Sequence, residues 1–307
     1  MVCPRSAAGV LTRVLVLGAG GMLGHKLVQR LGQALDVWTS FRRFDARLQA
    51  TGLFGRPQVL DGVDAWAPES VARALEAAQP EWVINCIGVI KQLTEGKEPR
   101  EAIYLNALWP HLLAERCAAH GARLLHVSTD CVFSGRRGRY LETDPTDAED
   151  LYGRTKALGE VDCPGCLTLR TSIVGRDLFA SVSLIDWFLT QRGGRVRGFA
   201  RAVYTGLTTD ALSREIQHLV GMRPPLEGLY QVSSQPINKY DLLQLVNEAF
   251  DAGVTIDRDE EFFCDRSLVS DRYWRAVGRE PPSWRAMVLE MANDPTSYDR
   301  IRSLKTD

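Results

Sequence analysis

The chain has 307 residues, of which 45% are hydrophobic and 24% charged, and its formal net charge is -1. These proportions are typical of a globular protein and exclude a disordered or fibrous one. Because there is no basic excess, we expect no nucleic-acid partner. No apolar run approaches the roughly 20 residues that a membrane helix needs, so we expect no membrane partner either.

The cysteines and the N-terminus predict a location. Seven cysteines, an odd number, are scattered along the chain, which argues against a disulfide framework and indicates a reducing compartment. Residues 1–13 lack the apolar core of a signal peptide, and we interpret them as a short disordered lead. The sequence therefore predicts a cytoplasmic protein.

The first predicted unit is a strand, a glycine turn and a helix. Residues 14–17 form a short β-branched run, Gly18 to Gly24 follow, and Leu23, Leu27 and Leu31 recur at helical spacing. Strands and helices then alternate, with strands expected at 37–41, 82–87 and 123–127 and helices at 70–78 and 102–120. Such βα units predict an α/β fold, a doubly wound parallel sheet of the Rossmann type.

The pattern loosens after a further helix at 152–161, a strand at 167–172 and a helix at 209–220. Helices at 241–250 and 283–291 follow, separated by prolines and glycines, which indicates a smaller and less regular C-terminal substrate lobe. We predict a dinucleotide-binding domain over 12–175, to which about 206–233 return. The substrate-binding lobe then comprises 176–205 and 234–307.

The glycine turn is the first candidate binding site. It ends a predicted strand and opens a predicted helix, where backbone N–H groups and the helix dipole hold a pyrophosphate. The three-residue step of its glycines is typical of short-chain dehydrogenases. We expect the cofactor to contact Gly18, Gly21, Met22, Leu23 and Gly24.

Two arginines after the second strand bear on the choice of dinucleotide. An acidic residue at this place accepts hydrogen bonds from the ribose 2′-OH and repels a 2′-phosphate, whereas this chain has Arg42 and Arg43. The sequence therefore favours NADP over NAD, unless the arginines belong to a solvated turn. Asp64 is placed to accept the adenine amino group, and the alternative is a helix-capping aspartate.

The catalytic signal is Tyr152-Gly153-Arg154-Thr155-Lys156. The four-residue step puts a phenol and an ammonium on one helix face, where Lys156 is expected to lower the pKa of Tyr152. Such a tyrosine can give a proton to a carbonyl oxygen. Thr129 ends a predicted parallel strand, where open α/β sheets bind their ligands, and can hydrogen-bond the same oxygen. The alternatives are an exposed helix face and a hydroxyl that only caps the strand.

Together, the glycine turn, the Ser-Thr-Asp-x-Val-Phe segment at 128–133 and the Tyr-Gly-x-Thr-Lys helix resemble the dTDP-4-dehydrorhamnose reductase family of extended short-chain dehydrogenases. The resemblance covers nearly the whole chain from about residue 12. It implies that Tyr152 donates the proton, Lys156 orients the nicotinamide ribose and Thr129 polarises the sugar carbonyl. It also implies cofactor contacts from Ser128 and Thr171 and substrate contacts from Asp130, Cys131 and Arg266. The segment 85–92 departs from the family pattern and is expected beside the cofactor and the sugar, with Cys86, Ile87 and Gly88 at the cofactor and Val89 and Lys91 at the substrate.

The resemblance leaves three activities open. Cys131 stands where related dehydratases need a carboxylate, which favours simple reduction. We expect NADP(H)-dependent reduction of a nucleotide-activated ketosugar, such as a 4-keto-6-deoxyhexose in deoxysugar or surface-glycan synthesis. The alternatives are a sugar-nucleotide epimerase and a non-catalytic, dinucleotide-binding regulatory subunit. Relatives also dimerise through helices matching 102–120 and 152–161. No metal is expected, because the histidines lack ligand spacing and Cys163-Pro164-Gly165-Cys166 has no second pair.

Overall fold

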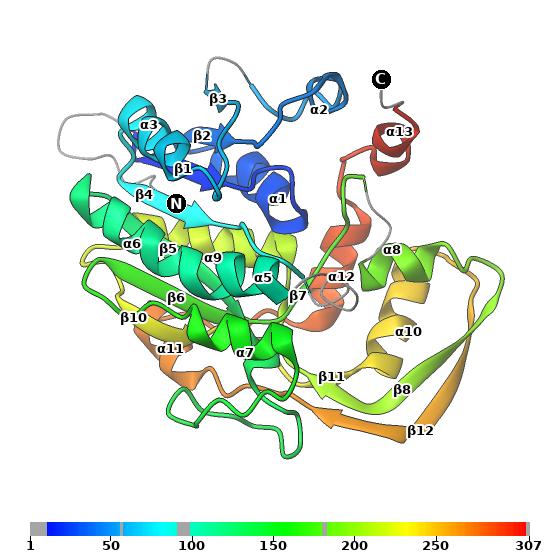
Figure 1. Cartoon of the computed structure of the whole chain (residues 1–307). Coiled ribbons are helices and arrows are strands. Elements are labelled where there is room, and N and C mark those ends of the chain that lie inside the picture. The colour runs from blue at the N-terminus through cyan, green and yellow to red at the C-terminus, as the bar shows by residue number, and fades with distance from the viewer. Residues whose placement is uncertain (1–10, 56–57, 91–98, 180–182, 305–307) are drawn as a thin grey trace.

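The computed structural model describes residues 11–55, 58–90, 99–179 and 183–304 of the chain. Residues 1–10 of the expected N-terminal lead and Lys91 lie outside these residues, and Arg13, expected in the lead, is the first residue of β1. A seven-stranded parallel sheet in the order β10-β6-β5-β4-β1-β2-β3 forms the centre of the molecule (Figure 1). Its strands are β1 (Arg13–Leu17), β2 (Asp36–Ser40), β3 (Val59–Leu60), β4 (Trp82–Asn85), β5 (Arg123–Thr129), β6 (Cys166–Thr171) and β10 (Gly228–Gln231). The prediction of a doubly wound α/β fold is confirmed.

Helices cover both faces of this sheet. One face carries α1 (Met22–Leu31) and α9 (Thr209–Gly221), and the other carries α3 (Pro68–Ala78), α6 (Trp109–Ala119) and α7 (Leu151–Leu158). Alternate residues of β1 enter different cores, since Val14 and Val16 pack on the α1 side and Leu15 and Leu17 on the α3 side. Strands buried on both faces have unbroken apolar sequences, which is why these strands were predictable.

The helix predicted over 102–120 is less regular than expected. It consists of α5 (Pro99–Ala102), a π-helical segment η1 (Ile103–Leu108) and α6. In η1 the buried Asn106 side chain pairs with the backbone of Val89, accepting from its N–H at 2.9 Å and donating to its carbonyl at 3.0 Å. This tertiary contact, which no local pattern shows, accompanies the wider turn.

Other boundaries differ by a few residues from the predictions. The strand expected at 82–87 ends at Asn85, and the helix expected at 152–161 ends at Leu158. At the second of these ends, a Cβ on Gly159 would lie 1.9 Å from the Asn106 carbonyl oxygen, so α7 stops where it meets η1. Asp36, expected before the second strand, is the first residue of β2.

A second sheet lies beside the first. It has the order β11-β8-β12, formed by β8 (Arg195–Tyr204), β11 (Ile237–Asn238) and β12 (Thr255–Asp265), and a short pair joins β7 (Ile173–Val174) to β9 (Leu207–Thr208). The remaining elements are α2 (Ala46–Ala50), the 3-10 turn η2 (Asp130–Val132), α8 (Leu184–Leu189), α10 (Lys239–Ala249), α11 (Asp271–Val277), α12 (Trp284–Ala292) and α13 (Tyr298–Ser303). Within the described ranges, no helix has the length and apolar character needed to span a bilayer.

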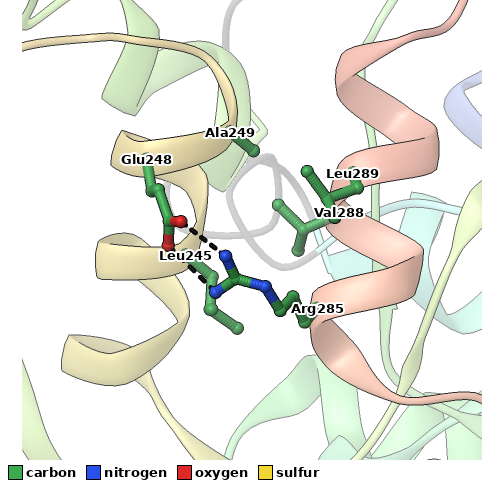
Figure 2. A pocket seen from close by; sticks show the side chains of 6 residues that line it. All are labelled: Leu245, Glu248, Ala249, Arg285, Val288 and Leu289. Carbon is green, nitrogen blue, oxygen red and sulfur yellow. Dashed lines mark hydrogen bonds and ion pairs between the residues drawn. The ribbon is translucent and has the colours of Figure 1, made fainter.

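Helices α10 and α12 pack together in this second part. Figure 2 shows Arg285 of α12 reaching the Glu248 carboxylate of α10, with nitrogen-to-oxygen distances of 2.5 and 3.1 Å. The space beside this ion pair, lined also by Leu245 and Val288, has a volume of about 10 Å³. That volume holds about one water molecule, so this space is a packing gap and no ligand site.

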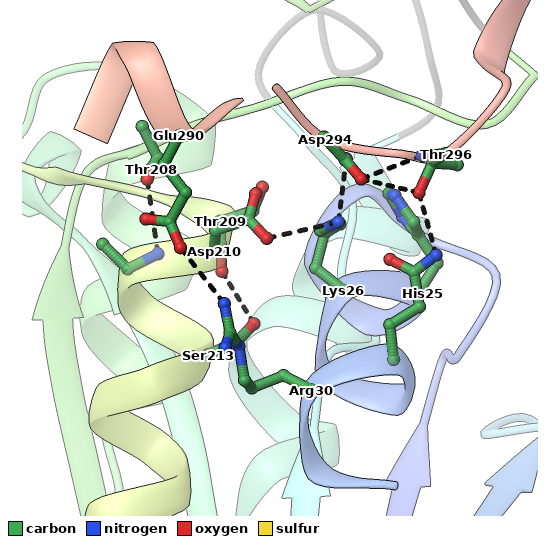
Figure 3. A network of polar contacts seen from close by, with 12 residues as sticks. His25, Lys26, Arg30, Thr208, Thr209, Asp210, Ser213, Glu290, Asp294 and Thr296 are labelled. Carbon is green, nitrogen blue, oxygen red and sulfur yellow. Dashed lines mark hydrogen bonds and ion pairs between the residues drawn. The ribbon is translucent and has the colours of Figure 1, made fainter. Parts of the chain in front are cut away.

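The residues after α12 return to the first sheet. The buried ammonium of Lys26, on α1, lies 2.8 Å from Asp294 and 3.2 Å from Asp210 of α9 (Figure 3). Next to it, Gln29 of α1 donates to the Thr296 hydroxyl at 2.9 Å. These contacts join the end of the predicted substrate lobe to α1. The division into a dinucleotide domain and a substrate lobe stays a prediction.

Candidate active site

The glycine turn brings the start of α1 against the end of β1. Gly18 has a φ of +77°, and a Cβ at Gly24 would lie 2.2 Å from the Gly18 carbonyl oxygen. Gly21 caps α1 without a side-chain hydrogen bond, and the first turn carries no acidic residue. The first N–H groups of this ten-residue helix therefore keep their capacity for an anion. The residues present fit a dinucleotide pyrophosphate.

A buried histidine is hydrogen-bonded to the backbone of the glycine turn. The Nδ1 of His25 donates to the Gly21 carbonyl oxygen at 2.9 Å, and its Nε2 lies 3.0 Å from the Tyr298 hydroxyl. Burial lowers the pKa of His25 to about 4, so the imidazole is neutral at physiological pH. The sequence did not single out this residue, whose partner is almost the whole chain away.

The arginines expected at the cofactor lie directly after β2. Arg42 and Arg43 are both exposed, and neither guanidinium forms an ion pair with another residue in the described ranges. Asp64 is half-buried, and its Oδ1 accepts the N–H of Trp66 at 3.0 Å. One oxygen of Asp64 thus stabilises the turn before α3, but Asp64 does not cap the helix, because the N-cap of α3 is Ala67 and receives no side-chain hydrogen bond. Contacts of all three residues with a cofactor stay predictions.

Thr129 and Tyr152 come together at the end of β5. Thr129 accepts the N–H of Cys131 at 3.1 Å and donates from its hydroxyl to the Asp130 carboxylate at 3.2 Å. Its side chain is near enough to the Tyr152 phenol to lower the pKa of that group. Asp150 caps α7 by accepting the Gly153 N–H at 2.8 Å, which sets the phase of the helix. A Cβ at position 153 would lie 2.2 Å from the Cys131 carbonyl oxygen, so glycine permits the close approach that brings the phenol to the hydroxyl.

The pKa of Tyr152 moves in the direction opposite to the one expected from the sequence. Burial raises it, and nearby Cys131 adds to the rise, while the hydrogen bond with Thr129 opposes it. The expectation that Lys156 lowers this pKa is wrong, because the Lys156 ammonium is directed to the Val127 carbonyl of β5. The phenol consequently keeps its proton throughout the physiological range.

Lys156 is buried beneath the sheet end. Its Nζ donates to the Val127 carbonyl at 2.8 Å and lies 3.4 Å from Nε2 of His126. Burial lowers the pKa of Lys156 to about 8, against the opposing pull of Glu160 and Cys86. The alternative of an exposed helix face is therefore wrong for Lys156, whose exposed fraction is 6%.

Asp130 and Arg266 are also close to this group. Burial raises the pKa of the Asp130 carboxyl, and the charge of Arg266 is the main influence that lowers it again. Arg266 donates from Nε to the Phe133 carbonyl oxygen at 2.8 Å and is half-buried, unlike the exposed arginine considered as an alternative. The structure thus brings together Thr129, Asp130, Tyr152 and Arg266. Cys131 is half-buried beside them.

The segment after β4 forms the neighbouring wall. Burial raises the pKa of the Cys86 thiol to about 12. Gly88 leaves no room for a side chain, since a Cβ there would lie 3.0 Å from the Asn106 amide oxygen. Ile87 is half-buried and Val89 is buried. The whole segment from Cys86 to Val89 is therefore held in place by β4 and η1.

Two hydroxyl groups expected at the cofactor are engaged with the protein. Ser128 donates to the Glu160 carboxylate at 2.8 Å, and Arg170 holds the same carboxylate through two hydrogen bonds of 2.7 Å. The buried Thr171 hydroxyl donates to the Ser172 carbonyl oxygen at 3.2 Å. Their contact with a cofactor stays a prediction.

Sequence reasoning assigned no polar contact to several residues here. Asn85 and His126 face each other on β4 and β5, and Asn106 comes from η1. The Tyr204 hydroxyl, on β8, is buried and has no hydrogen-bond partner in the described residues, and the nearby Asp130 charge adds to the burial that raises its pKa. The only signal that could have pointed to Asn85 and His126 was that each is a polar residue within the apolar sequence of a strand.

Neither a metal centre nor a disulfide is evident in the described part of the chain. No group of three or more His, Cys, Asp or Glu side chains there could hold a metal ion. The thiols of Cys163 and Cys166 contact each other without a covalent bond.

The chain is similar to known sugar-nucleotide enzymes. Residues 12–180 match the model of the RmlD substrate binding domain family. A probable dTDP-4,6-dihydroxy-2-methyloxan-3-one 4-ketoreductase of Streptomyces antibioticus is 30% identical over 310 aligned positions, which cover 92% of this chain and 95% of that protein. A dTDP-4-dehydrorhamnose reductase of Streptomyces griseus is 38% identical over 149 residues, covering 48% of this chain and 43% of that one.

Solved structures show the same fold. A dTDP-4-dehydrorhamnose reductase from Bacillus anthracis, solved in complex with NADP, has a TM-score of 0.74 at 21% identity, and the likeness covers 92% of this chain and 99% of that one. The family model spans more than half of the 307 residues and the ketoreductase match spans almost all of them. This chain therefore belongs to the RmlD substrate binding domain family.

Proposed function

We propose that this protein is an oxidoreductase that reduces the ketone of a nucleotide-activated sugar with NADP(H), and that the sugar is a 4-keto-6-deoxyhexose. Membership of the family and the name of the ketoreductase relative support this activity. The single observation that carries it is that Thr129, Asp130 and a protonated Tyr152 come together at the carboxyl end of β5, where Gly153 lets α7 approach Cys131 closely. Open parallel sheets bind their ligands at that end.

The proposed chemistry divides between cofactor and protein. A dinucleotide bound here would supply the hydride that the carbonyl carbon of the sugar accepts. Tyr152 holds a proton on its phenol oxygen and gives it to the carbonyl oxygen as negative charge develops there. Thr129 donates a hydrogen bond to the same oxygen. Lys156 orients the nicotinamide ribose.

The cofactor is proposed to occupy the edge of the sheet above β1 and β4. The open N-terminus of α1, with Gly18, Gly21, Met22, Leu23 and Gly24, binds the pyrophosphate. Arg42 and Arg43 bind the 2′-phosphate, which is the reason for preferring NADP, and NAD remains the alternative cofactor because several structural neighbours were solved with NAD. The remainder of the dinucleotide is flanked by Asp64, Cys86, Ile87, Gly88, Ser128 and Thr171.

The sugar nucleotide is proposed to lie on the other side of Tyr152. Val89, Asp130 and Cys131 line the sugar, and Arg266 pairs with the diphosphate, for which a guanidinium provides a planar pair of donors. Lys91 belongs to the same proposal but lies outside the described residues. Because Cys131 is a thiol and no carboxylate, this site lacks the base that dehydration needs.

Substitution of the proton donor tests the proposal. Tyr152→Phe should lower kcat for dTDP-4-dehydrorhamnose by about 10²–10⁴-fold while leaving the Kd for NADPH unchanged. Loss of NADPH absorbance measures turnover, and fluorescence of the bound cofactor measures Kd. Tyr240→Phe, on α10, is the matched control, because its hydroxyl only accepts a hydrogen bond from Gln244. Turnover of Tyr152→Phe within a few-fold of the wild type contradicts the proposal.

The same assay separates the two alternatives. An epimerase converts its sugar nucleotide without net loss of NADPH, so product would form while the absorbance stays constant. A regulatory subunit binds NADPH but shows no change in thermal midpoint with any of a panel of dTDP-, UDP- and GDP-sugars. Net oxidation of NADPH in proportion to product supports the reductase alone.

We also propose a cytoplasmic homodimer formed through residues 102–120 and 152–161, which comprise η1, α6 and most of α7, and in which η1 contacts both helices. Large apolar side chains are exposed on these elements, namely Ile103 at 51%, Leu108 at 47% and Leu158 at 69%. Such a cluster is typical of a surface that another chain covers. Sedimentation of the wild type as a dimer and of Leu158→Glu as a monomer would support this, and a monomeric wild type would contradict it.

A further inference from the structure

His126 is a buried imidazole that the proposed chemistry does not use. It lies on β5 opposite Asn85 of β4, and both side chains are 1% exposed. Residues two apart on a strand share a face, so His126 and Ser128 both point toward α7. Ser128 meets Glu160 there, and His126 meets Lys156.

The hydrogen bonds around Asn85 determine which nitrogen of His126 carries the proton. The amide oxygen of Asn85 accepts the Ile87 N–H at 3.1 Å, so its amide nitrogen faces Nδ1 of His126, also at 3.1 Å. An amide nitrogen only donates, and Nδ1 must therefore accept. The neutral ring then carries its proton on Nε2, which lies 3.4 Å from Nζ of Lys156.

This arrangement places an N–H group against Lys156. An ammonium has three donors and no acceptor, whereas a neutral amine has a lone pair that can accept the Nε2 proton. A hydrogen bond to the neutral form of a group disfavours its charged form. The N–H of His126 therefore acts on Lys156 in the same direction as burial does, and against the Val127 carbonyl at 2.8 Å.

We propose that Asn85 and His126 are positioning residues which, by presenting a donor to Lys156, set the pH above which that side chain loses its ammonium form. The proposal rests on the proposed function only in giving Lys156 a catalytic task. His126 itself stays neutral, because burial and the charge of Lys156 hold its pKa well below the usual value. Activity that needs the ammonium then falls as the pH rises through about 8, the value to which the pKa of Lys156 is lowered.

Other titratable groups face the same ammonium and act in the opposite direction. Glu160, two residues beyond the end of α7, and Cys86, after β4, both raise the pKa of Lys156. Glu160 is itself held by Arg170 of β6. From the helix side, His111 of α6 adds only to the lowering of the His126 pKa. None of these groups is changed by a substitution at Asn85 or His126.

Reversal of the imidazole tests the inference. In Asn85→Asp a carboxylate replaces the donating amide, so Nδ1 must donate and Nε2 becomes an acceptor for the ammonium. We expect the pKa of Lys156 to rise by at least about one unit. The double variant Asn85→Asp with His126→Leu keeps the new charge but removes the imidazole, and its rise should be clearly smaller. His218→Leu, on α9, is the control for loss of a histidine elsewhere.

The measurements do not depend on turnover. The ¹³Cε signal of Lys156 in lysine-labelled protein gives its pKa directly, and the chain has only six lysines to assign. Nitrogen NMR of the wild-type ring should show Nε2 protonated and Nδ1 bare, a result available even if a variant fails to fold. A protonated Nδ1 overturns the inference, as does an equal rise in the single and double variants.

The pH profile links this inference to function. With dTDP-4-dehydrorhamnose, the alkaline limb of kcat/KM should move upward in Asn85→Asp together with the NMR titration. An NMR shift in a protein that reduces no sugar nucleotide would end the proposed function and leave the inference on Lys156 intact. If the variant turns over and the Lys156 titration moves, but the alkaline limb of kcat/KM stays in place, the role assigned to Asn85 and His126 is overturned.

Discussion

The glycine turn and the group around Tyr152 are built in different ways, although both lie at the carboxyl edge of the same sheet. The turn uses backbone geometry, since a φ of +77° at Gly18 and the absence of a Cβ at Gly24 leave the first N–H groups of α1 open. The Tyr152 group uses buried side chains from β5, α7 and the second part of the chain. Binding of NADPH at the glycine turn should therefore depend on the room that the glycines leave. Reduction of the sugar at Tyr152 should depend on where the side chains lie and on their charges.

The largest effect expected from this difference concerns Gly153. In Gly153→Ala the new Cβ would lie 2.2 Å from the Cys131 carbonyl oxygen, so α7 must move away from η2. Displacement of a reacting group by about 1 Å can cost about 100-fold in rate, and we expect that loss in kcat with little change in the Kd for NADPH. Stopped-flow reduction and cofactor fluorescence measure the two quantities.

The control for this prediction is Gly55→Ala, because a Cβ at that position meets nothing within 4 Å. It should leave both quantities unchanged. If Gly153→Ala weakens NADPH binding as much as it slows reduction, the two regions are not separable and the comparison fails.

The second prediction makes the converse change. In Gly24→Ala the Cβ would lie 2.2 Å from the Gly18 carbonyl oxygen, which closes the turn on itself. Overpacking of this kind costs about 1–3 kcal/mol, and we expect the Kd for NADPH to rise by about tenfold or more. With saturating cofactor, kcat should recover to near the wild-type value.

Calorimetry with NADPH is the direct measurement, and Gly55→Ala again serves as the control. A variant that binds NADPH as the wild type does, while losing kcat, would show that the turn serves chemistry and not binding.

The same difference explains how much could be predicted. The turn was visible in the sequence because its glycines recur every three residues. The Tyr152–Lys156 pair was visible because both residues lie within one helix. The partners of that pair were not. His126, Asn85 and Asn106 act through strand register and a π-helical turn, and the direction of the Tyr152 pKa depends on burial that no local pattern shows.

The second sheet was missed for another reason. Residues of β12 alternate poorly between buried and exposed, and the strand contains a run of acidic residues that a sequence pattern assigns to a loop. Its pairing with β8 shifts register between Asp259 and Phe263, so β12 has no regular period to be detected. Every second residue of β8 is buried, so that strand was detectable and was overlooked. The boundaries of the proposed substrate lobe were correspondingly hard to predict.

The smallest effect is expected at the edge of the turn, where side chains meet solvent. Arg42 and Arg43 are exposed and pair with no other described residue, so their removal should leave the fold unchanged. An exposed ionic contact contributes about 0.2–1 kcal/mol, so Arg42→Ala and Arg43→Ala should each raise the KM for NADPH by no more than about fivefold. The KM for NADH, which lacks the 2′-phosphate, should stay the same.

The salt dependence sharpens this last prediction. Salt screens an exposed ion pair, so the preference of the wild type for NADPH over NADH should shrink as the ionic strength rises. The variant that combines Arg42→Ala with Arg43→Ala should show little change. Arg275→Ala, on α11 and remote from the turn, is the control for loss of an exposed arginine. Equal effects on the KM values of the two cofactors would place these arginines at a group that NADPH and NADH share, and would remove the reason for preferring NADP.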